Sequence, residues 1–186
     1  ADFAPTDTTN YNSLTAASAG NFVIDPAASV TDVTCTSPHT YTGSPITPCS
    51  VSVTGAGGLN LTPTPTYSNN TNAGLASASY TFAGDTNHTG SNDSANFTID
   101  QASSNTVITC PASEVYTGSA IEPCNAAVTG AGGLNTTETV TYGNNVNVGT
   151  ATANASYAGD SNHTGSVATE ETFDITPADA NCSSIV

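Results

Sequence analysis

The sequence predicts an all-β protein: tandem immunoglobulin-like antiparallel β-sandwiches arranged as a rod. Three observations predict this class. Thr, Val and Tyr, which favour strands, are common, and no segment keeps a helical apolar period over three turns. Turn-forming segments recur every 8 to 12 residues or so, about the spacing found in sandwiches. In addition, a long stretch of the sequence repeats itself.

The repeat has a period of 75 residues. VTGAGGLN at 53–60 returns unchanged at 128–135, and FAGDTNHTGS at 82–91 returns as YAGDSNHTGS at 157–166. The match runs without a gap until one residue is inserted near the end of the second copy. Because each copy is long enough to form a small sandwich, the sequence predicts consecutive domains of one kind.

The limits of the repeat divide the chain into four parts. The two central parts are complete units, and the two outer parts match only pieces of a unit. The first part matches the C-terminal strands of a preceding, diverged repeat, and the last matches the first strand of a following repeat. The four parts are residues 1–26, 27–101, 102–177 and 178–186.

Within the first complete unit, alternating apolar residues predict five short strands. Turn sequences such as TGS, GAGG, SNNTN and GDTNHTG separate them. The third strand, LTPTPTY, is interrupted by proline and is therefore expected at a sheet edge. The expected strands are 30–36, 45–57, 61–67, 73–82 and 94–100.

Cysteine spacing predicts one disulfide in each unit. Cys35 and Cys49 are 14 residues apart, and Cys110 and Cys124 repeat this spacing. Regular pairs in a chain without a CxxC or Cys/His metal pattern are typical of disulfides in an oxidising compartment. Buried free thiols are the alternative. Cys182 has no partner within its unit, so we expect it to pair with another repeat or another chain, if it pairs at all.

Charge excludes several classes of function. The chain has 15 acidic residues and no Lys or Arg, so its net charge is -15. Binding to nucleic acid or to anionic lipid requires basic side chains, and a Schiff-base lysine or an arginine clamp cannot exist here. No run approaches the roughly 18 apolar residues of a transmembrane helix, so we expect no membrane insertion. Together with the paired cysteines, this predicts a secreted or cell-surface location.

The Asp-x-Asn-His loops are the weak candidates for a metal site. Asp85 and Asn87, repeated as Asp160 and Asn162, place oxygen atoms at alternate positions, as Ca²⁺ ligands often are. Each loop offers only one carboxylate, however, which favours an Asx-type turn. His39 has no counterpart in the second unit, and no serine lies in a nucleophile motif, so we expect neither enzyme activity nor a cofactor.

Other residues are candidates for contact with carbohydrate, although packing within the sandwich is the favoured role of the tyrosines. Tyr67 and Tyr142 precede Asn-rich turns, and Tyr41 and Tyr116 open the YTGS turns, where aromatic rings could either stack on sugars or pack at the ends of a sandwich. N-x-S/T sequons mark candidate glycosylation sites in a secreted chain. They are Asn60, Asn69, Asn87, Asn92, Asn96, Asn135, Asn154, Asn162 and Asn181.

The repeated motifs resemble those of a known class of bacterial repeat. The YTG opening, the TY-x-NN-x-N-x-G element and the AGD-x-NH-x-GS element are similar to the tandem Ig-like repeats, of the MBG type, in very large bacterial surface proteins. The resemblance covers nearly the whole chain. One departure is the complete absence of Lys and Arg, of which many such repeats carry a few. The resemblance implies a stalk or spacer, because in such proteins the adhesive part lies elsewhere.

We therefore expect a structural extracellular segment: a stalk, a spacer or part of a filament in a microbial surface protein. Its partners would be neighbouring repeats or copies of itself. An alternative is a filament subunit in which one chain's C-terminal strand completes the next chain's N-terminal fragment. Another alternative is an adhesin module that binds a glycan or a host receptor.

Overall fold

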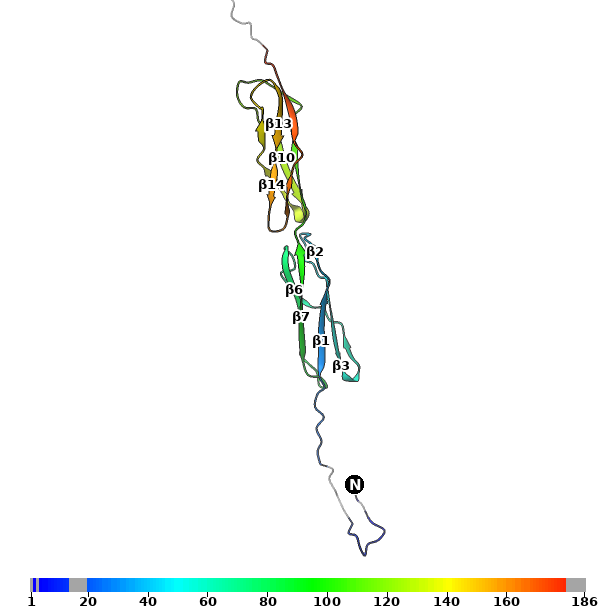
Figure 1. The fold of residues 1–186 in the computed structure, drawn as a ribbon. Helices are drawn as coiled ribbons and strands as arrows, with labels where there is room; N and C mark the ends of the chain where they lie inside the picture. The colour runs from blue at the N-terminus through cyan, green and yellow to red at the C-terminus, as the bar shows by residue number, and fades with distance from the viewer. Residues whose placement is uncertain (1, 3, 14–19, 180–186) are drawn as a thin grey trace, which may run out of the picture.

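The computed structural model describes residues 2, 4–13 and 20–179, and its regular structure is almost entirely β-strand. Two sets of sheets lie end to end, and the N-terminal residues extend away from the first set (Figure 1). The helices among these residues are two three-residue 3-10 turns, η1 (Ala56–Gly58) and η2 (Ala131–Gly133). None of the described helices is long and apolar enough to cross a membrane.

Seven strands form the first unit, which we define as Ser29–Asp100. They are β1 (Ser29–Cys35), β2 (His39–Thr40), β3 (Cys49–Gly55), β4 (Leu59–Leu61), β5 (Thr66–Ser68), β6 (Gly74–Phe82) and β7 (Ser91–Asp100). One sheet has the order β1-β3-β4 and the other has the order β2-β7-β6-β5. A sandwich of two sheets is what the sequence predicts.

Nine strands form the second unit, Ser104–Thr176. They are β8 (Ser104–Thr109), β9 (Ser113–Val115), β10 (Asn125–Gly130), β11 (Asn135–Glu138), β12 (Thr141–Gly143), β13 (Gly149–Asn154), β14 (Ser156–Gly159), β15 (Thr164–Val167) and β16 (Glu171–Thr176). Their sheets are β8-β10-β11, β12-β13-β16-β9 and the hairpin β14-β15.

The larger number of strands reflects one local difference. In the first unit β6 and β7 pair without a break from Gly74 to Phe82. In the second unit the matching hairpin divides, because Ala153 pairs with Glu171 whereas Ser156 pairs with Val167. One strand therefore has an extra residue between these pairs, as in a β-bulge. This is where the single inserted residue of the sequence lies.

Two details differ from the expected strands. The segment 61–67 is not one strand: β4 ends at Leu61 and β5 begins at Thr66, because the prolines between them cannot donate to a ladder. The pairing is also not wholly antiparallel, since β2 runs parallel to β7 and β9 runs parallel to β16. After β1 the chain crosses to the other sheet, where it meets the last strand running in the same direction.

The core of each unit is small and built from repeat-related residues. Phe97 and Ile99 in the first unit, and Phe173 and Ile175 in the second, are 1 to 2% exposed. Alanines of the paired strands β6 and β13 lie beside them in the same sheet, and no leucine is buried among the described residues. Such a core is modest, so cross-links and contacts between units contribute a large share of the stability.

The described residues before the first unit carry no strand. Phe22 and Ile24 correspond in the repeat to Phe97 and Ile99, yet they are 85% and 82% exposed. The expected strands of a preceding repeat at 1–26 therefore remain a prediction. Most of the expected strand at 178–186 lies outside the described residues.

Candidate functional site

Both expected disulfides are present. Cys35 at the end of β1 bonds to Cys49 at the start of β3, and Cys110 bonds to Cys124 in the second unit. The first pair also occupies opposite positions in the ladder between the two strands. Each bond closes a loop with a sequence separation of 14. These bonds indicate an oxidising environment. Cys182 lies outside the described residues.

The Asp-x-Asn-His loops form compact turns. One carboxylate oxygen of Asp85 accepts hydrogen bonds from the amides of Asn87 and His88, both at 2.7 Å. Asp160 makes the same two bonds, also at 2.7 Å, in the second unit. These are the bonds of an Asx-type turn. Among the described residues, no three His, Cys, Asp or Glu side chains gather as a metal site would require.

Each of these loops ends in a histidine that joins two turns of its unit. The Nδ1 atom of His163 lies 2.9 Å from the Asp160 carboxylate, and its Nε2 atom lies 2.9 Å from the Ala131 carbonyl oxygen in η2. His88 makes the equivalent contacts with Asp85 and with the carbonyl of Ala56. We call each of these bridges a histidine staple.

The partners of a staple reveal the charge of its ring. A carboxylate and a backbone carbonyl can only accept hydrogen bonds, so both ring nitrogens must donate, and only the doubly protonated imidazolium can do this. The hydrogen bond to Ala131 raises the pKa of His163; burial opposes this, and Asp160 adds to the increase. In a chain without Lys or Arg, histidine is the only kind of side chain that can carry this positive charge.

The carboxylate of the second staple is held ionised. Burial is the largest single effect and opposes the charged form of Asp160, but the hydrogen bonds that the carboxylate accepts, first among them the one from the Asn162 amide, together outweigh it. The Tyr157 hydroxyl, at 2.8 Å, and the His163 ring lower the pKa of Asp160 further, to about 2. Asp160 is therefore ionised at neutral pH, and the staple is an ion pair whenever the ring of His163 carries both protons.

The second staple also lies where the two units meet. The Tyr41 ring of the first unit packs edge-to-face against the ring of His163, with centroids 5.3 Å apart, and lies over Gly132 of η2. The Asn162 side chain accepts a hydrogen bond from the Ala73 amide at 2.9 Å and donates one to Asn72 at 3.3 Å. We call these contacts the joint.

The connecting segment is bonded to the same loop. The amide of Ala102 donates to the Asn162 carbonyl, and the Ala102 carbonyl accepts from the Thr164 amide. The side chain of Gln101 donates to the Asp160 carbonyl at 2.6 Å. The linker is thus a short strand-like bridge between the units.

The tyrosines considered for sugar binding have structural partners. The Tyr67 hydroxyl accepts from the Cys49 amide at 2.9 Å and donates to the Cys49 carbonyl at 3.1 Å, and Tyr142 repeats this arrangement with Cys124. The Tyr41 ring is in the joint. Tyr116, its counterpart in the second unit, is 38% exposed.

Most of the candidate glycosylation asparagines are accessible. Asn60, Asn69, Asn87, Asn92, Asn96, Asn135 and Asn154 are exposed. Asn162 is half-buried and its amide nitrogen is engaged in the joint, so a glycan there would displace these contacts. Asn181 lies outside the described residues.

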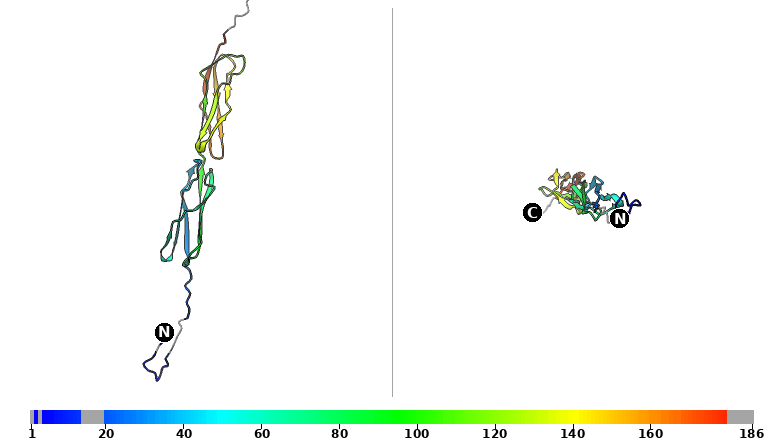
Figure 2. Two further views of the ribbon diagram at one scale, coloured as in Figure 1. Left: turned by 180° about the vertical axis from the view of Figure 1, so that it is seen from behind. Right: turned by 90° about the horizontal axis from the view of Figure 1, so that it is seen from below.

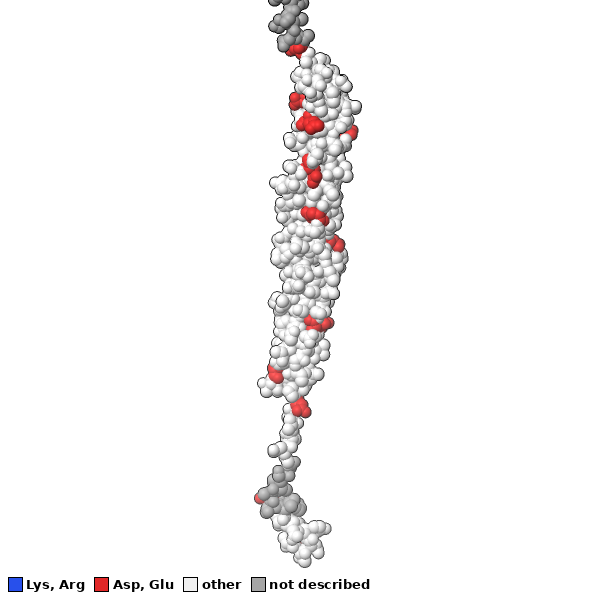
Figure 3. Space-filling view, turned by 90° about the vertical axis from the view of Figure 1, so that its left-hand side faces the viewer, with Lys and Arg blue, Asp and Glu red and all other residues white. Residues whose placement is uncertain are grey.

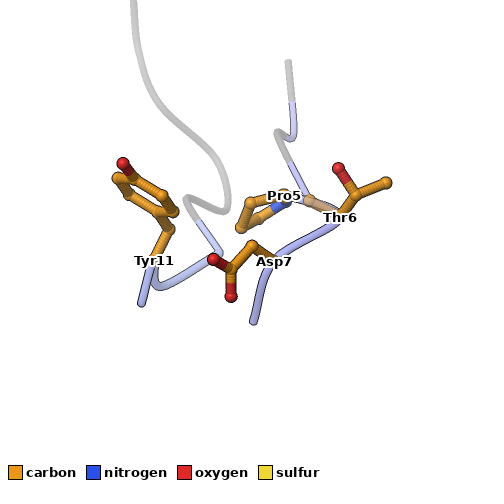
Figure 4. Close-up of a pocket in the computed structure, with 5 residues that line it drawn as sticks. Pro5, Thr6, Asp7 and Tyr11 are labelled. Atoms are coloured by element: carbon orange, nitrogen blue, oxygen red, sulfur yellow. The ribbon is translucent and has the colours of Figure 1, made fainter. Parts of the chain in front are cut away.

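The surface offers little that would concentrate a ligand. On the face shown in Figure 3, the acidic side chains are scattered along the length of the molecule, with no Lys or Arg between them. A hollow near the N-terminus is lined by Ala4, Pro5, Thr6, Asp7 and Tyr11. Figure 4 shows residues of one short stretch of chain lining it, and the Asp7 carboxylate of this stretch accepts hydrogen bonds from the amides of Thr9 and Asn10.

Sequence comparison assigns no family. Neither the protein-family models nor the curated protein sequences contain a match to this chain. Sequence reasoning missed the staples and the joint, although the Asp-x-x-His spacing in a chain without Lys or Arg was the signal for the first.

Proposed function

We propose that this chain is a structural segment of an extracellular, rod-like repeat protein, in which it acts as a stalk or spacer at a microbial surface. The observation that carries the proposal is the arrangement of the first and last strands of the first unit, β1 and β7. A unit in a stalk is pulled between these two strands. Their mutual geometry therefore decides how it resists force.

In the first unit, β1 and β7 run parallel, and side chains join them along their length. The Ser91 hydroxyl lies 2.7 Å from those of both Ser29 and Thr31. Further along, the Val33 amide donates to the Asp93 carboxylate at 2.8 Å. In the second unit, Ser166 repeats the hydroxyl cluster with the corresponding residues of β8, but it lies on β15, the strand before the last one, β16.

In this arrangement, tension acts on all the hydrogen bonds between β1 and β7 at the same time. The chain enters at the start of β1 and leaves at the end of β7, at opposite ends of the unit (Figure 1). Tension therefore slides two parallel strands along each other, and their cross-links must break jointly. Since forced unfolding is governed by the unfolding rate, joint rupture favours a long-lived folded state under load.

The joint supports the rod. Seen along its length, the molecule has a small cross-section, as the right-hand view of Figure 2 shows. The linker bonds and the Tyr41 contact both resist bending between the units. We assign the sandwiches to the immunoglobulin-like class because their N-terminal strands are divided: β1 pairs with β3 in one sheet, and β2 runs parallel to the last strand in the other.

Single-molecule pulling on the whole chain tests the proposal. We expect two unfolding events, one for each unit. Ser91→Ala should lower the unfolding force of one event only, because it removes the hydroxyl shared by two residues of β1. Thr66→Ala, on the exposed edge strand β5, is the matched control and should leave both forces unchanged. If Ser91→Ala also has no effect, the terminal strands do not resist the load, and the proposed role fails.

A second candidate, the filament subunit, is favoured by the exposed apolar side chains of Phe22 and Ile24. Their repeat counterparts are core residues, so these side chains would become buried if the C-terminal strand of another chain completed the N-terminal fragment. Analytical ultracentrifugation should then show concentration-dependent polymers. Replacing both residues by Ser, or deleting 178–186, should abolish these polymers. A monomer at all concentrations would exclude this candidate.

A further inference from the structure

We propose that the joint between the two units is a pH-sensitive hinge, locked while the ring of His163 carries both protons and released when it loses one. The inference goes beyond the stalk role. It depends on contacts at the joint, not on the resistance of the units to force.

His163 is buried within the joint. Its side chain is 5% exposed, whereas that of His88, which has no Tyr41 counterpart among the described residues, is 11% exposed. The ring of His163 contacts Tyr41 of the first unit, and the preceding residue, Asn162, makes the two hydrogen bonds to Asn72 and Ala73.

Loss of one proton from the His163 ring breaks one of its two hydrogen bonds. A neutral ring would direct a lone pair at either the Asp160 carboxylate or the Ala131 carbonyl, and the contact would become repulsive. Loss of either hydrogen bond frees one of the two segments that form the joint. The Asp160 side fixes the loop that holds Asn162, and the Ala131 side fixes η2, on which the Tyr41 ring rests.

Several titratable groups lie near the His163 ring. From its own loop there is Asp160, to which Tyr157 of β14 donates a hydrogen bond. From β11, Glu138 acts on Tyr157. From the first unit there is Tyr41. No Lys or Arg exists to replace the lost cation.

The direction of the pKa shift of His163 determines how the stability of the joint changes with pH. The pKa of His163 in the folded protein lies above the ordinary value of 6.5. The stabilising contribution is therefore complete below that ordinary value and is lost as pH rises through the folded pKa. The hinge is therefore locked at the ordinary pKa and just below it, and it is released as pH rises through the higher pKa of the folded protein.

The test follows the whole chain by NMR from about pH 5 to about pH 9. The ¹⁵N shifts of the histidine rings report protonation, and residual dipolar couplings report whether both units share one alignment. We expect one shared alignment while His163 is doubly protonated and two different alignments after it titrates. His163→Gln should show two alignments at every pH. His88→Gln, the matched control, should behave as the wild type at the joint.

Each contrary result overturns the proposal. A shared alignment that persists after His163 titrates would show that the proton does not hold the joint, and so would a shared alignment in His163→Gln. A ring that stays doubly protonated throughout would show that no hinge operates in this range. If His163→Gln does not fold, the wild-type titration still decides. Because the pulling experiment detects shear within units, either proposal can fail while the other stands.

Discussion

Reduction of the disulfides should lengthen both unfolding steps of the chain under force by a calculable amount. An intact Cys35–Cys49 bond removes the loop between the cysteines from the extensible chain. At about 3.4 Å for each residue step, the 14 steps span about 48 Å when extended, and subtracting the 4.0 Å between the Cα atoms leaves about 44 Å. The second unit should gain nearly the same length, because its cysteines have the same separation.

The assay compares contour-length increments of the oxidised chain and of a chain reduced before pulling. The matched variant is Cys110→Ala/Cys124→Ala without reductant, in which only one of the two increments should lengthen. Equal increments before and after reduction would refute the reasoning, since the loops would then not be closed within each unit. In solution, opening one loop should cost about 3 kcal/mol of unfolding free energy.

Three further predictions concern single side chains. Tyr67→Phe leaves the amide and carbonyl of Cys49 unpaired, so denaturant unfolding should show a loss of about 1–3 kcal/mol in the first unit only. Gly132→Ala should give separate alignments in residual dipolar couplings, because its Cβ would lie 2.5 Å from the Tyr41 hydroxyl; Gly57→Ala, with a similar positive φ but open space, should not. The stabilisation from Asp160 should be present above its ordinary pKa of 3.8 and disappear in acid titration as pH falls towards about 2; a second unit equally stable throughout that window would contradict the shift.

Local patterns in the sequence predicted much of the architecture. Alternation located most of the long strands, and the cysteine spacing predicted both disulfides, because these features depend on neighbours in the chain. The sequence did not predict β2 and β9, which are only two and three residues long. Strands so short have no detectable alternation. They exist because the last strand of each unit offers them a parallel partner.

The histidine staples could not be predicted from the sequence, for a different reason. The turn formed by Asp85 and its neighbours was predicted from loop chemistry, but the second partner of each histidine is a carbonyl 32 residues away. Only the fold brings η1 to that loop. The composition nonetheless indicates the first partner. Because the chain has no Lys or Arg, a histidine three positions after an acidic residue is the nearby side chain that can pair with it as a cation.

The joint could not be predicted from either unit alone, yet both of its halves are encoded in every repeat. Tyr116 and Gly118 correspond to Tyr41 and Gly43 at one end, and His88 corresponds to His163 at the other. The repeat therefore specifies an interface that is complete only when two units follow one another. We expect any further unit of this kind placed in series to form the same contacts, because the linker bonds at Ala27 already match those at Ala102. In a stalk built in this way, contacts with the preceding unit would set the direction of each unit.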